Sequence, residues 1–179
     1  ALKRSLAQAL IGLGELDRAR PLLEGISPYS PRYAEARMLL ASITPDLDAK
    51  LAILGDLQSN QPGRPGALIQ KMSLLREAGR HAEAVEVFRA YREANRQVPT
   101  AARDLAFTAK VDSGDHAAAA EFAAELARST GMARWRNFAV LMRLEDSADA
   151  AAGMLPAIGE ADLLDALFGV IASRNLGYD

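Results

Sequence analysis

The chain has 179 residues, of which 50% are hydrophobic and 25% are charged, and its formal net charge is -2. This composition indicates a folded domain or a short repeat array and excludes a disordered tail. No apolar run approaches the ~20 residues that a transmembrane helix needs, and the slightly acidic balance provides no overall basic field for nucleic acid.

Helix-forming segments follow one another along the whole chain. Apolar residues recur at spacings of three and four, which predicts short α-helices and no strand. Ser30 and Thr44 each precede a proline, an arrangement in which the hydroxyl caps a helix and the proline occupies its first turn. The stretch QSNQPGRPG, at residues 58–66, is rich in proline and glycine and predicts a loop between two repeats.

Turns of a common pattern separate these helices. GELDRA at residues 14–19 returns as GRHAEA at residues 79–84 and as GDHAAA at residues 114–119, while TPDLDA at residues 44–49 takes the remaining place. The final alanines of the four segments are spaced by 30, 35 and 35 residues. The glycine that opens three of them predicts a left-handed turn between two helices.

This period resembles that of the tetratricopeptide repeat (TPR) family, whose unit of about 34 residues is a helix, a turn and a second helix. The family's first-helix pattern matches Trp135, Phe138, Ala139 and Met142 best, and weaker copies begin at Lys3, Tyr33, Leu68 and Ala102. The resemblance covers nearly the whole chain. It implies an all-α fold, a right-handed α-solenoid of antiparallel helix-turn-helix repeats.

The repeats are expected to form a single array. Its boundaries are predicted at about 1–30, 31–64, 65–99, 100–131 and 132–160, with the start of a further repeat or a terminal helix at 161–179. That last segment would leave Leu164, Leu167, Phe168 and Ile171 partly uncovered. We therefore expect the parent chain to continue, or the segment to pair with another copy, because natural arrays end in a polar cap.

Neither a metal site nor an active site is predicted. His81 and His116 lie two residues after a turn glycine in two successive repeats. This equivalence favours a structural joint over a pair of metal ligands. The chain has no cysteine, no Gly-rich phosphate loop followed by Lys-Ser or Lys-Thr, and no Ser-centred nucleophile elbow. We expect a protein that is not an enzyme and binds no cofactor.

A partner-binding groove is predicted instead. In the TPR family, the positions one, five and eight residues after the first-helix anchor line the concave face. In this sequence those positions hold six basic residues and no acidic one. The predicted partner-binding residues are Arg4, Gln8, Met38, Ser73, Arg76, Arg103, Phe107, Lys110, Arg136, Val140 and Arg143.

These residues predict a non-catalytic scaffold for protein–protein interaction. A partly basic, partly apolar groove suits an acidic peptide or segment of another protein, with an anionic polymer as the alternative ligand. The alternative function is a structural spacer, or a segment that self-associates through its helix ends. The Ala- and Arg-rich composition suggests a bacterial parent protein, such as a component of exopolysaccharide export or assembly. The expected location is a soluble compartment, the periplasm in preference to the cytoplasm.

Overall fold

The computed structural model describes residues 2–146, and their side chains as far as residue 143. Within these residues lie nine α-helices and no strand, which confirms the all-α prediction. The predicted terminal segment, 161–179, lies outside the described residues, as do its four apolar residues. The helices are α1 (Leu2–Gly12), α2 (Leu16–Glu24), α3 (Tyr33–Ser42), α4 (Leu47–Asn60), α5 (Pro65–Glu77), α6 (His81–Ala94), α7 (Thr100–Asp112), α8 (His116–Thr130) and α9 (Ala133–Asp146).

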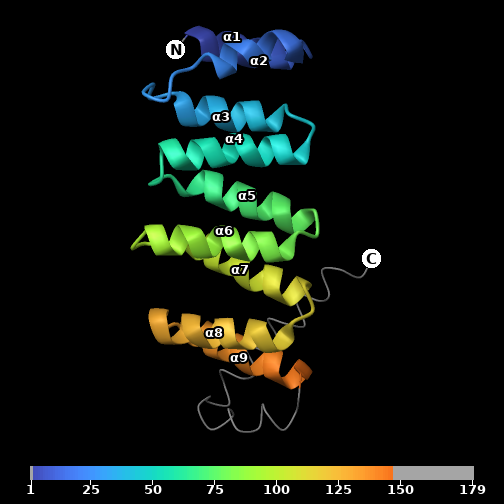
Figure 1. Ribbon diagram of the computed structural model, residues 1–179, viewed down its shortest axis with the longest axis vertical. Coiled ribbons are helices and arrows are strands. Elements are labelled where there is room, and N and C mark those ends of the chain that lie inside the picture. The colour runs from blue at the N-terminus through green and yellow to red at the C-terminus, as the bar shows by residue number, and fades with distance from the viewer. Residues whose placement is uncertain (1, 147–179) are drawn as a thin grey trace. The chain divides into compact units, whose positions relative to one another are not determined.

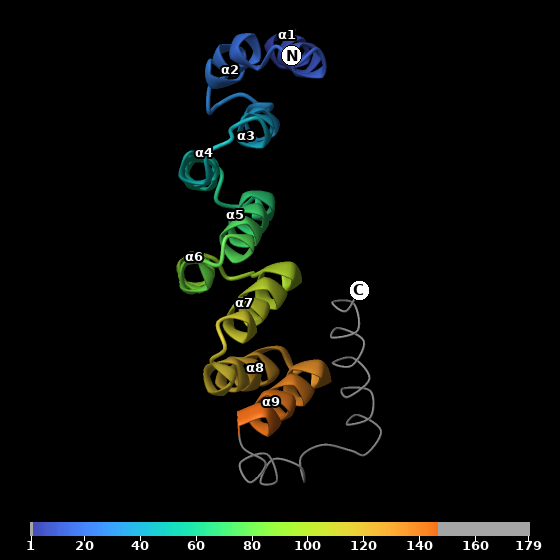
Figure 2. The same cartoon turned by 90° about the vertical axis from the view of Figure 1, so that its right-hand side faces the viewer.

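The chain divides into two compact units, Ala1–Ala106 and Phe107–Asp179, which we call unit 1 and unit 2. In unit 1, helices α1 to α6 follow one another in chain order and run alternately in opposite directions (Figure 1). Seen along the helices, α1, α3 and α5 form one column, and α2, α4 and α6 form a second (Figure 2). We refer to the members of the first column as first helices and to those of the second as second helices. Every helix of the described part is too short or too polar to span a lipid bilayer.

Two apolar clusters hold unit 1 together. The first joins α1, α2 and α3 through Leu10, Leu23, Ile26 and Leu40, with small residues such as Ala7 allowing the helices to approach closely. The second joins α3 and α4 to the start of α5, and its buried members are Tyr33, Ala34, Ala41, Leu54, Leu57 and Ala67. Each large side chain buried in this way contributes about 1.5 to 3 kcal/mol. The 3.6-residue apolar period of the sequence is thus realised as one buried stripe per helix.

Left-handed glycines make the turns between paired helices. Gly14, Gly79 and Gly114 have φ angles of 77°, 73° and 79°, which confirms the predicted turn conformation. After Gly79, the N–H of Arg80 donates to the Leu75 carbonyl at 2.8 Å. This bond and the one from the Gly79 N–H to the Arg76 carbonyl, at 2.9 Å, form the Schellman motif that ends a helix.

Replacing Gly79 with alanine should lower the free energy of unfolding by about 1 to 2 kcal/mol, because a Cβ strains a left-handed backbone. Urea denaturation followed by circular dichroism measures this loss. Gly12→Ala is the control, since Gly12 lies within α1 and has open space around its Cα. That variant should be as stable as the parent or slightly more stable. Equal losses in both variants would contradict the turn argument.

The predicted capping roles of Ser30 and Thr44 are wrong. Helix α3 begins at Tyr33, and the Ser30 hydroxyl accepts the Arg32 N–H at 3.2 Å, so it caps the turn before the helix. The buried Thr44 hydroxyl donates to the Leu40 carbonyl at 2.8 Å. The cap of α4 is Asp46, whose carboxylate accepts the Ala49 N–H at 2.8 Å. A carboxylate, which is a strong acceptor, takes the capping position in place of the hydroxyl.

A polar cluster links α3 to α4 beside the second apolar cluster. The Tyr33 hydroxyl donates to the Asp56 carboxylate, which also pairs with Arg37 at 3.2 Å. The Arg37 guanidinium lies 4.9 Å from the centre of the Tyr33 ring. Burial raises the pKa of the Tyr33 phenol, and the hydrogen bond to Asp56 raises it further. The phenol therefore stays protonated and acts as the donor.

Unit 2 is built on an aromatic cluster. The Phe107 ring stacks on Phe138 at a centroid distance of 4.9 Å and meets Trp135 edge-on at 5.6 Å. Trp135 also meets Phe138 edge-on, at 5.7 Å. These are the offset-stacked and edge-to-face geometries that aromatic pairs prefer. Helices α8 and α9 pack against each other, and α8 contributes buried Phe122 and Leu126.

Candidate functional site

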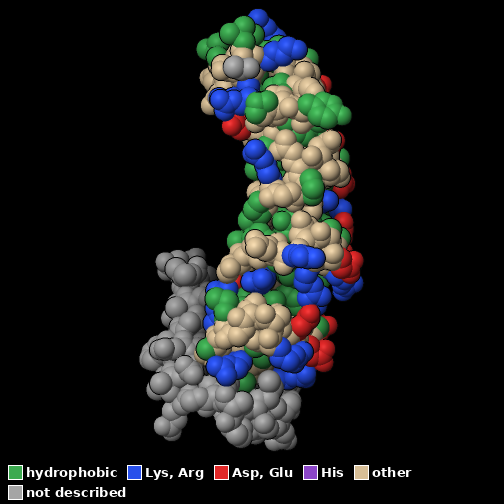
Figure 3. Space-filling view, turned by 90° about the vertical axis from the view of Figure 1, so that its left-hand side faces the viewer, with side chains coloured by type: hydrophobic (Ala, Val, Ile, Leu, Met, Phe, Trp, Pro, Cys, Tyr) green, Lys and Arg blue, Asp and Glu red, His purple; other side chains and the backbone are tan. Residues whose placement is uncertain are grey.

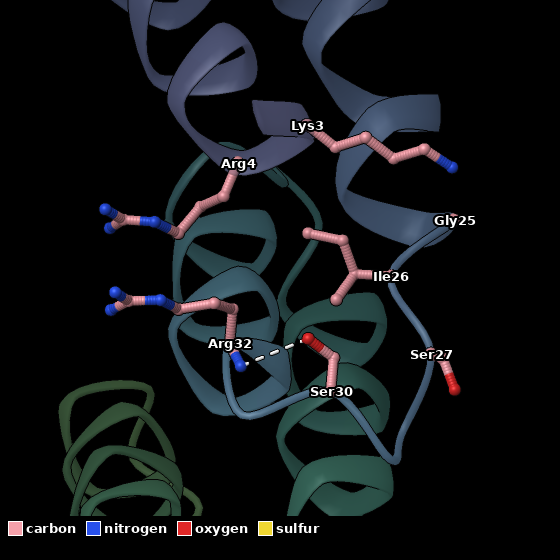
Figure 4. A pocket seen from close by; sticks show the side chains of 7 residues that line it. All are labelled: Lys3, Arg4, Gly25, Ile26, Ser27, Ser30 and Arg32. Carbon is pink, nitrogen blue, oxygen red and sulfur yellow. Dashed lines mark hydrogen bonds between the residues drawn. The ribbon is translucent and has the colours of Figure 1, made fainter. Parts of the chain in front are cut away.

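A pocket lies between the first turn of α1 and the loop that joins α2 to α3 (Figure 4). Its volume is about 200 Å³. The lining residues are Lys3, Arg4, Gly25, Ile26, Ser27, Ser30 and Arg32. Three of the seven carry a positive charge and none carries a negative one.

Local hydrogen bonds shape the loop side of this pocket. The N–H of Tyr29 donates to the Ser27 hydroxyl oxygen at 3.3 Å, and the N–H of Ser30 donates to the Ser27 carbonyl at 2.9 Å. The N–H of Tyr33 then donates to the Ser30 carbonyl at 3.0 Å, where α3 begins. Two prolines in this loop restrict its φ angles further. The loop is thus held in one conformation by its own backbone and serines.

The floor of the pocket is apolar. Ile26 is buried and belongs to the cluster that includes Leu10 and Leu23. In Figure 4 its side chain lies between Lys3 and Ser30. Lys3, Arg4 and Arg32 line the sides, and the charged ends of such long side chains stay in water.

Basic groups occupy two sides of the pocket. The Arg4 and Arg32 side chains extend in the same direction, one above the other, whereas Lys3 extends the opposite way past Gly25 (Figure 4). Both arginines contact the carboxylate of Glu35, Arg4 at 3.1 Å and Arg32 at 3.0 Å. We call Arg4 and Arg32 the arginine rim, and Lys3 the lysine rim.

Two helix starts add to the positive potential at this place. Lys3 and Arg4 lie in the first turn of α1, which has no acidic residue, and Arg32 is the residue that precedes α3. The N-terminal end of a helix carries a partial positive charge, so a cation there is unfavourable and an anion is favourable. The first turn of α3 already contains the carboxylate of Glu35, so it is the start of α1 that suits an anionic group supplied from outside.

The predicted groove residues of unit 1 lie on α1, α3, α5 and α7. Arg4 lines the pocket, while Gln8 is exposed on the same helix. Met38 packs on the second apolar cluster. The remaining three are partly buried, Ser73 and Arg76 on α5 and Arg103 on α7.

The predicted groove residues of unit 2 divide into buried and accessible ones. Phe107 and Val140 are only 8% and 1% exposed and belong to the core. Arg136 is exposed on α9. Lys110 lies 5.7 Å from the Phe122 ring centre, and Arg143 pairs with Glu121 at 3.5 Å.

Sequence reasoning missed Lys3, Ile26 and Arg32 as site residues. Lys3 begins a weaker copy of the first-helix pattern and is exposed at the pocket. A usable signal was present: Lys3 and Arg4 are adjacent cations at a helix start, where the macrodipole disfavours them. Ile26 and Arg32 give no such signal, because only the folded loop brings them next to α1.

The two histidines begin α6 and α8, at equivalent turns, and their Nδ1 atoms are buried. Within residues 2–146, no three His, Asp or Glu side chains gather as ligands for a metal ion. At the turn before α6, Arg80 pairs with both Glu83 and Asp48. The hydrogen bond from Arg80 lowers the pKa of the Glu83 carboxyl. This exposed ion-pair network joins α4 to α6 and resembles a structural contact more than a reactive site.

Charge is distributed unevenly over unit 1. Taken together, α1, α3 and α5 carry more basic than acidic residues, and α2, α4 and α6 carry more acidic than basic residues. On the face shown in Figure 3, basic side chains lie over the α1 and α3 end and also farther down, and acidic ones lie mainly along the edge of the second helices. The first-helix side of unit 1 is therefore its more basic side.

The chain is similar to known proteins in its fold and not in its sequence. No protein-family model and no curated protein matches this sequence. Two solved structures of MamA, a TPR-containing protein, are similar. A MamA RS-1 ArsTM double mutant gives a TM-score of 0.55 at 13% identity, over 94% of each chain. MamA 41-end from Desulfovibrio magneticus RS-1 gives 0.52 at 15% identity, over 87% of this chain and 90% of that chain. The likeness confirms the fold class, a TPR-like α-solenoid.

Proposed function

We propose that this chain is a non-catalytic scaffold that binds an acidic segment of a partner protein along its first helices. The uneven charge of unit 1 carries the proposal: α1, α3 and α5 together have five basic and two acidic residues, whereas α2, α4 and α6 have five basic and seven acidic ones. Arg4 and Arg76 belong to the first helices α1 and α5, and Arg103 lies on α7, which we count as a first helix because it opens the next predicted repeat. Guanidinium groups form bidentate, charge-assisted hydrogen bonds with carboxylates, which suits an acidic segment.

Unit 2 offers a similar set of cations on α7 and α9. Lys110, Arg136 and Arg143 lie on these helices. Because Phe107 and Val140 are buried, we leave them out of the proposed partner surface. Any apolar contact to the partner would then come from other residues, such as the partly buried Met38 of unit 1.

Charge reversal on a first helix should weaken binding more than the same change on a second helix. We expect Arg103→Glu to reduce affinity for a fluorescein-labelled, Glu-rich peptide about tenfold or more, since a hydrogen bond to a charged group contributes about 1.5 to 3 kcal/mol. Arg92→Glu, on the exposed side of α6, is the matched control and should cost much less. Fluorescence anisotropy measures both affinities, and circular dichroism confirms that both variants are folded.

Binding should also fall as salt is added, because exposed charges are screened beyond the ~8 Å Debye length at physiological ionic strength. We call the proposed binding surface, formed by basic residues of the first helices, the first-helix surface. An affinity that does not change with salt concentration would refute it, and so would equal losses of affinity in Arg103→Glu and Arg92→Glu. An acidic polysaccharide of matched charge, used as competitor, separates the two ligand classes. If it binds and the peptide does not, the ligand is an anionic polymer, such as one handled in exopolysaccharide export or assembly.

One observation favours a second candidate function, self-association through a helix end. Leu2, Leu6 and Leu13 of the first hairpin are exposed, together with Leu16 at the start of α2. An apolar patch on a surface marks an interaction site, and Leu2 and Leu6 lie one helical turn apart on α1. Light scattering over a range of protein concentrations tests this candidate. A dimer that Leu6→Glu dissociates would support it, and a monomer at all concentrations would exclude it.

A further inference from the structure

We propose that the pocket between α1 and the α2–α3 loop receives an apolar side chain of the partner segment, flanked in that segment by acidic residues that pair with the two rims. This inference rests on the proposed function, because it assumes an acidic partner. It goes further by naming what the partner presents at one place: an apolar residue with an acidic residue two positions to either side.

The apolar requirement comes from the floor of the pocket. Ile26 is continuous with the buried cluster of α1, α2 and α3, so a side chain that fills the pocket extends this core outward. The volume of about 200 Å³ accommodates a residue such as leucine. Covering the floor removes apolar surface from water, which is the driving force for burial.

The acidic requirement comes from the rims. Arg4 and Arg32 lie on one side of the pocket and Lys3 extends to the other (Figure 4). In an extended segment, residues i and i+2 point to the same face and lie about 6.6 Å apart. With the apolar residue in the pocket, the residues at i−2 and i+2 therefore reach toward opposite rims.

The arginine rim already binds a carboxylate of this chain. Glu35 contacts Arg4 at 3.1 Å and Arg32 at 3.0 Å, which aligns the two guanidinium groups side by side. Three cations, Lys3, Arg4 and Arg32, therefore line the pocket, and the Glu35 carboxylate contacts two of them. The positive ends of α1 and α3 act in the same direction. A partner carboxylate would balance the start of α1, whose first turn has no acidic residue, whereas the first turn of α3 already contains Glu35.

Three synthetic peptides test the pattern directly. The first has the core Glu-Ser-Leu-Ser-Glu, the second replaces the leucine with serine, and the third replaces both glutamates with glutamine. Binding is followed by NMR through the Ile26 methyl signals, which Ile26→Val identifies. We expect the second peptide to bind about tenfold or more weakly than the first, because it does not bury a leucine side chain in the pocket. The third should bind at least fivefold more weakly and lose its salt dependence.

Variants of the protein test the pocket itself. Ser30→Leu fills the pocket and should abolish the shift of the Ile26 signals, and Lys3→Glu should weaken binding of the first peptide about tenfold. If Ser30→Leu fails to fold, the affinity of Lys3→Glu for the first peptide still tests the pocket. Arg18→Glu is the control, because Arg18 lies on α2, pairs with Glu15 and does not line the pocket. It should bind the first peptide as the parent protein does.

The inference and the proposed function fail in different ways. If Lys3→Glu binds the first peptide as tightly as Arg18→Glu does, or if the serine and leucine peptides bind equally, the pocket inference is overturned. Weaker binding in Arg103→Glu would still support the first-helix surface in that case. The opposite result is also distinguishable. If Lys3→Glu weakens binding of the first peptide, the pocket inference is supported. If Arg103→Glu does not change the affinity for a long Glu-rich peptide, the first-helix surface is refuted.

Discussion

Replacing Trp135 with alanine is expected to lower the free energy of unfolding of unit 2 by about 3 to 5 kcal/mol. The Trp135 side chain is 0% exposed and meets Phe107 and Phe138 edge-on at 5.6 and 5.7 Å. Each aromatic pair contributes about 0.5 to 1.5 kcal/mol beyond the area that it buries. The substitution removes both pairs and leaves a cavity between α7 and α9.

Circular dichroism is the appropriate measurement, because Trp135 is the one tryptophan of the chain and its replacement removes the fluorescent probe. Arg136→Ala is the matched control, since Arg136 is the next residue of α9 and is exposed. Its effect should stay within about 0.5 kcal/mol. A loss below about 1 kcal/mol for Trp135→Ala would show that the aromatic cluster does not hold unit 2 together.

Leu23→Ala is expected to destabilise unit 1 by about 2 to 5 kcal/mol. Leu23 is fully buried in α2, in the cluster that also contains Leu10 of α1 and Leu40 of α3. It therefore connects the first hairpin to the second. The cavity that alanine leaves is surrounded by packed side chains of α1, α2 and α3, and these collapse into it only in part.

The same substitution at the other end of α2 is the control. Leu16 is 40% exposed, and Leu16→Ala should cost less than about 1 kcal/mol, because alanine is at least as good a helix former and little apolar area is lost. Urea denaturation of both variants, followed by circular dichroism, compares them. If the two losses are equal, burial in the first cluster is not what stabilises α2.

The helices and their turns could be predicted because both depend on local sequence. The anchors Tyr33, Leu68, Ala102 and Trp135 are all fully buried, as the repeat pattern implies. Gly79 and its two counterparts adopt the left-handed conformation, which glycine alone enters without strain. The start of α4 at Leu47 could not be placed correctly, because the Asp46 carboxylate caps the helix while the Thr44 hydroxyl bonds to the preceding helix. The start of α3 at Tyr33 was misplaced because the Ser30 hydroxyl caps the turn before the helix.

The candidate site was less predictable, since it depends on distances between separate segments. Ile26 and Arg32 occur in a loop whose sequence indicates only that one helix ends and the next begins. The fold places them beside Lys3. The buried position of Phe107 shows a second cause. The anchor Ala102 is buried as predicted, yet the large aromatic ring five positions later reaches the neighbouring helix α9 and is buried against it. Stacking of Phe107 on Phe138 then fixes the ring in the core.

The order of contacts in unit 1 has a consequence for how the protein folds. From α1 to α6, each helix packs mainly on the one before it and the one after it, and the turns that connect them are short. Residues in contact are therefore close in sequence, so little loop-closure entropy is lost before packing is gained. Chains of this low contact order fold quickly, and any adjacent pair of helices can serve as the nucleus from which the rest propagates in both directions.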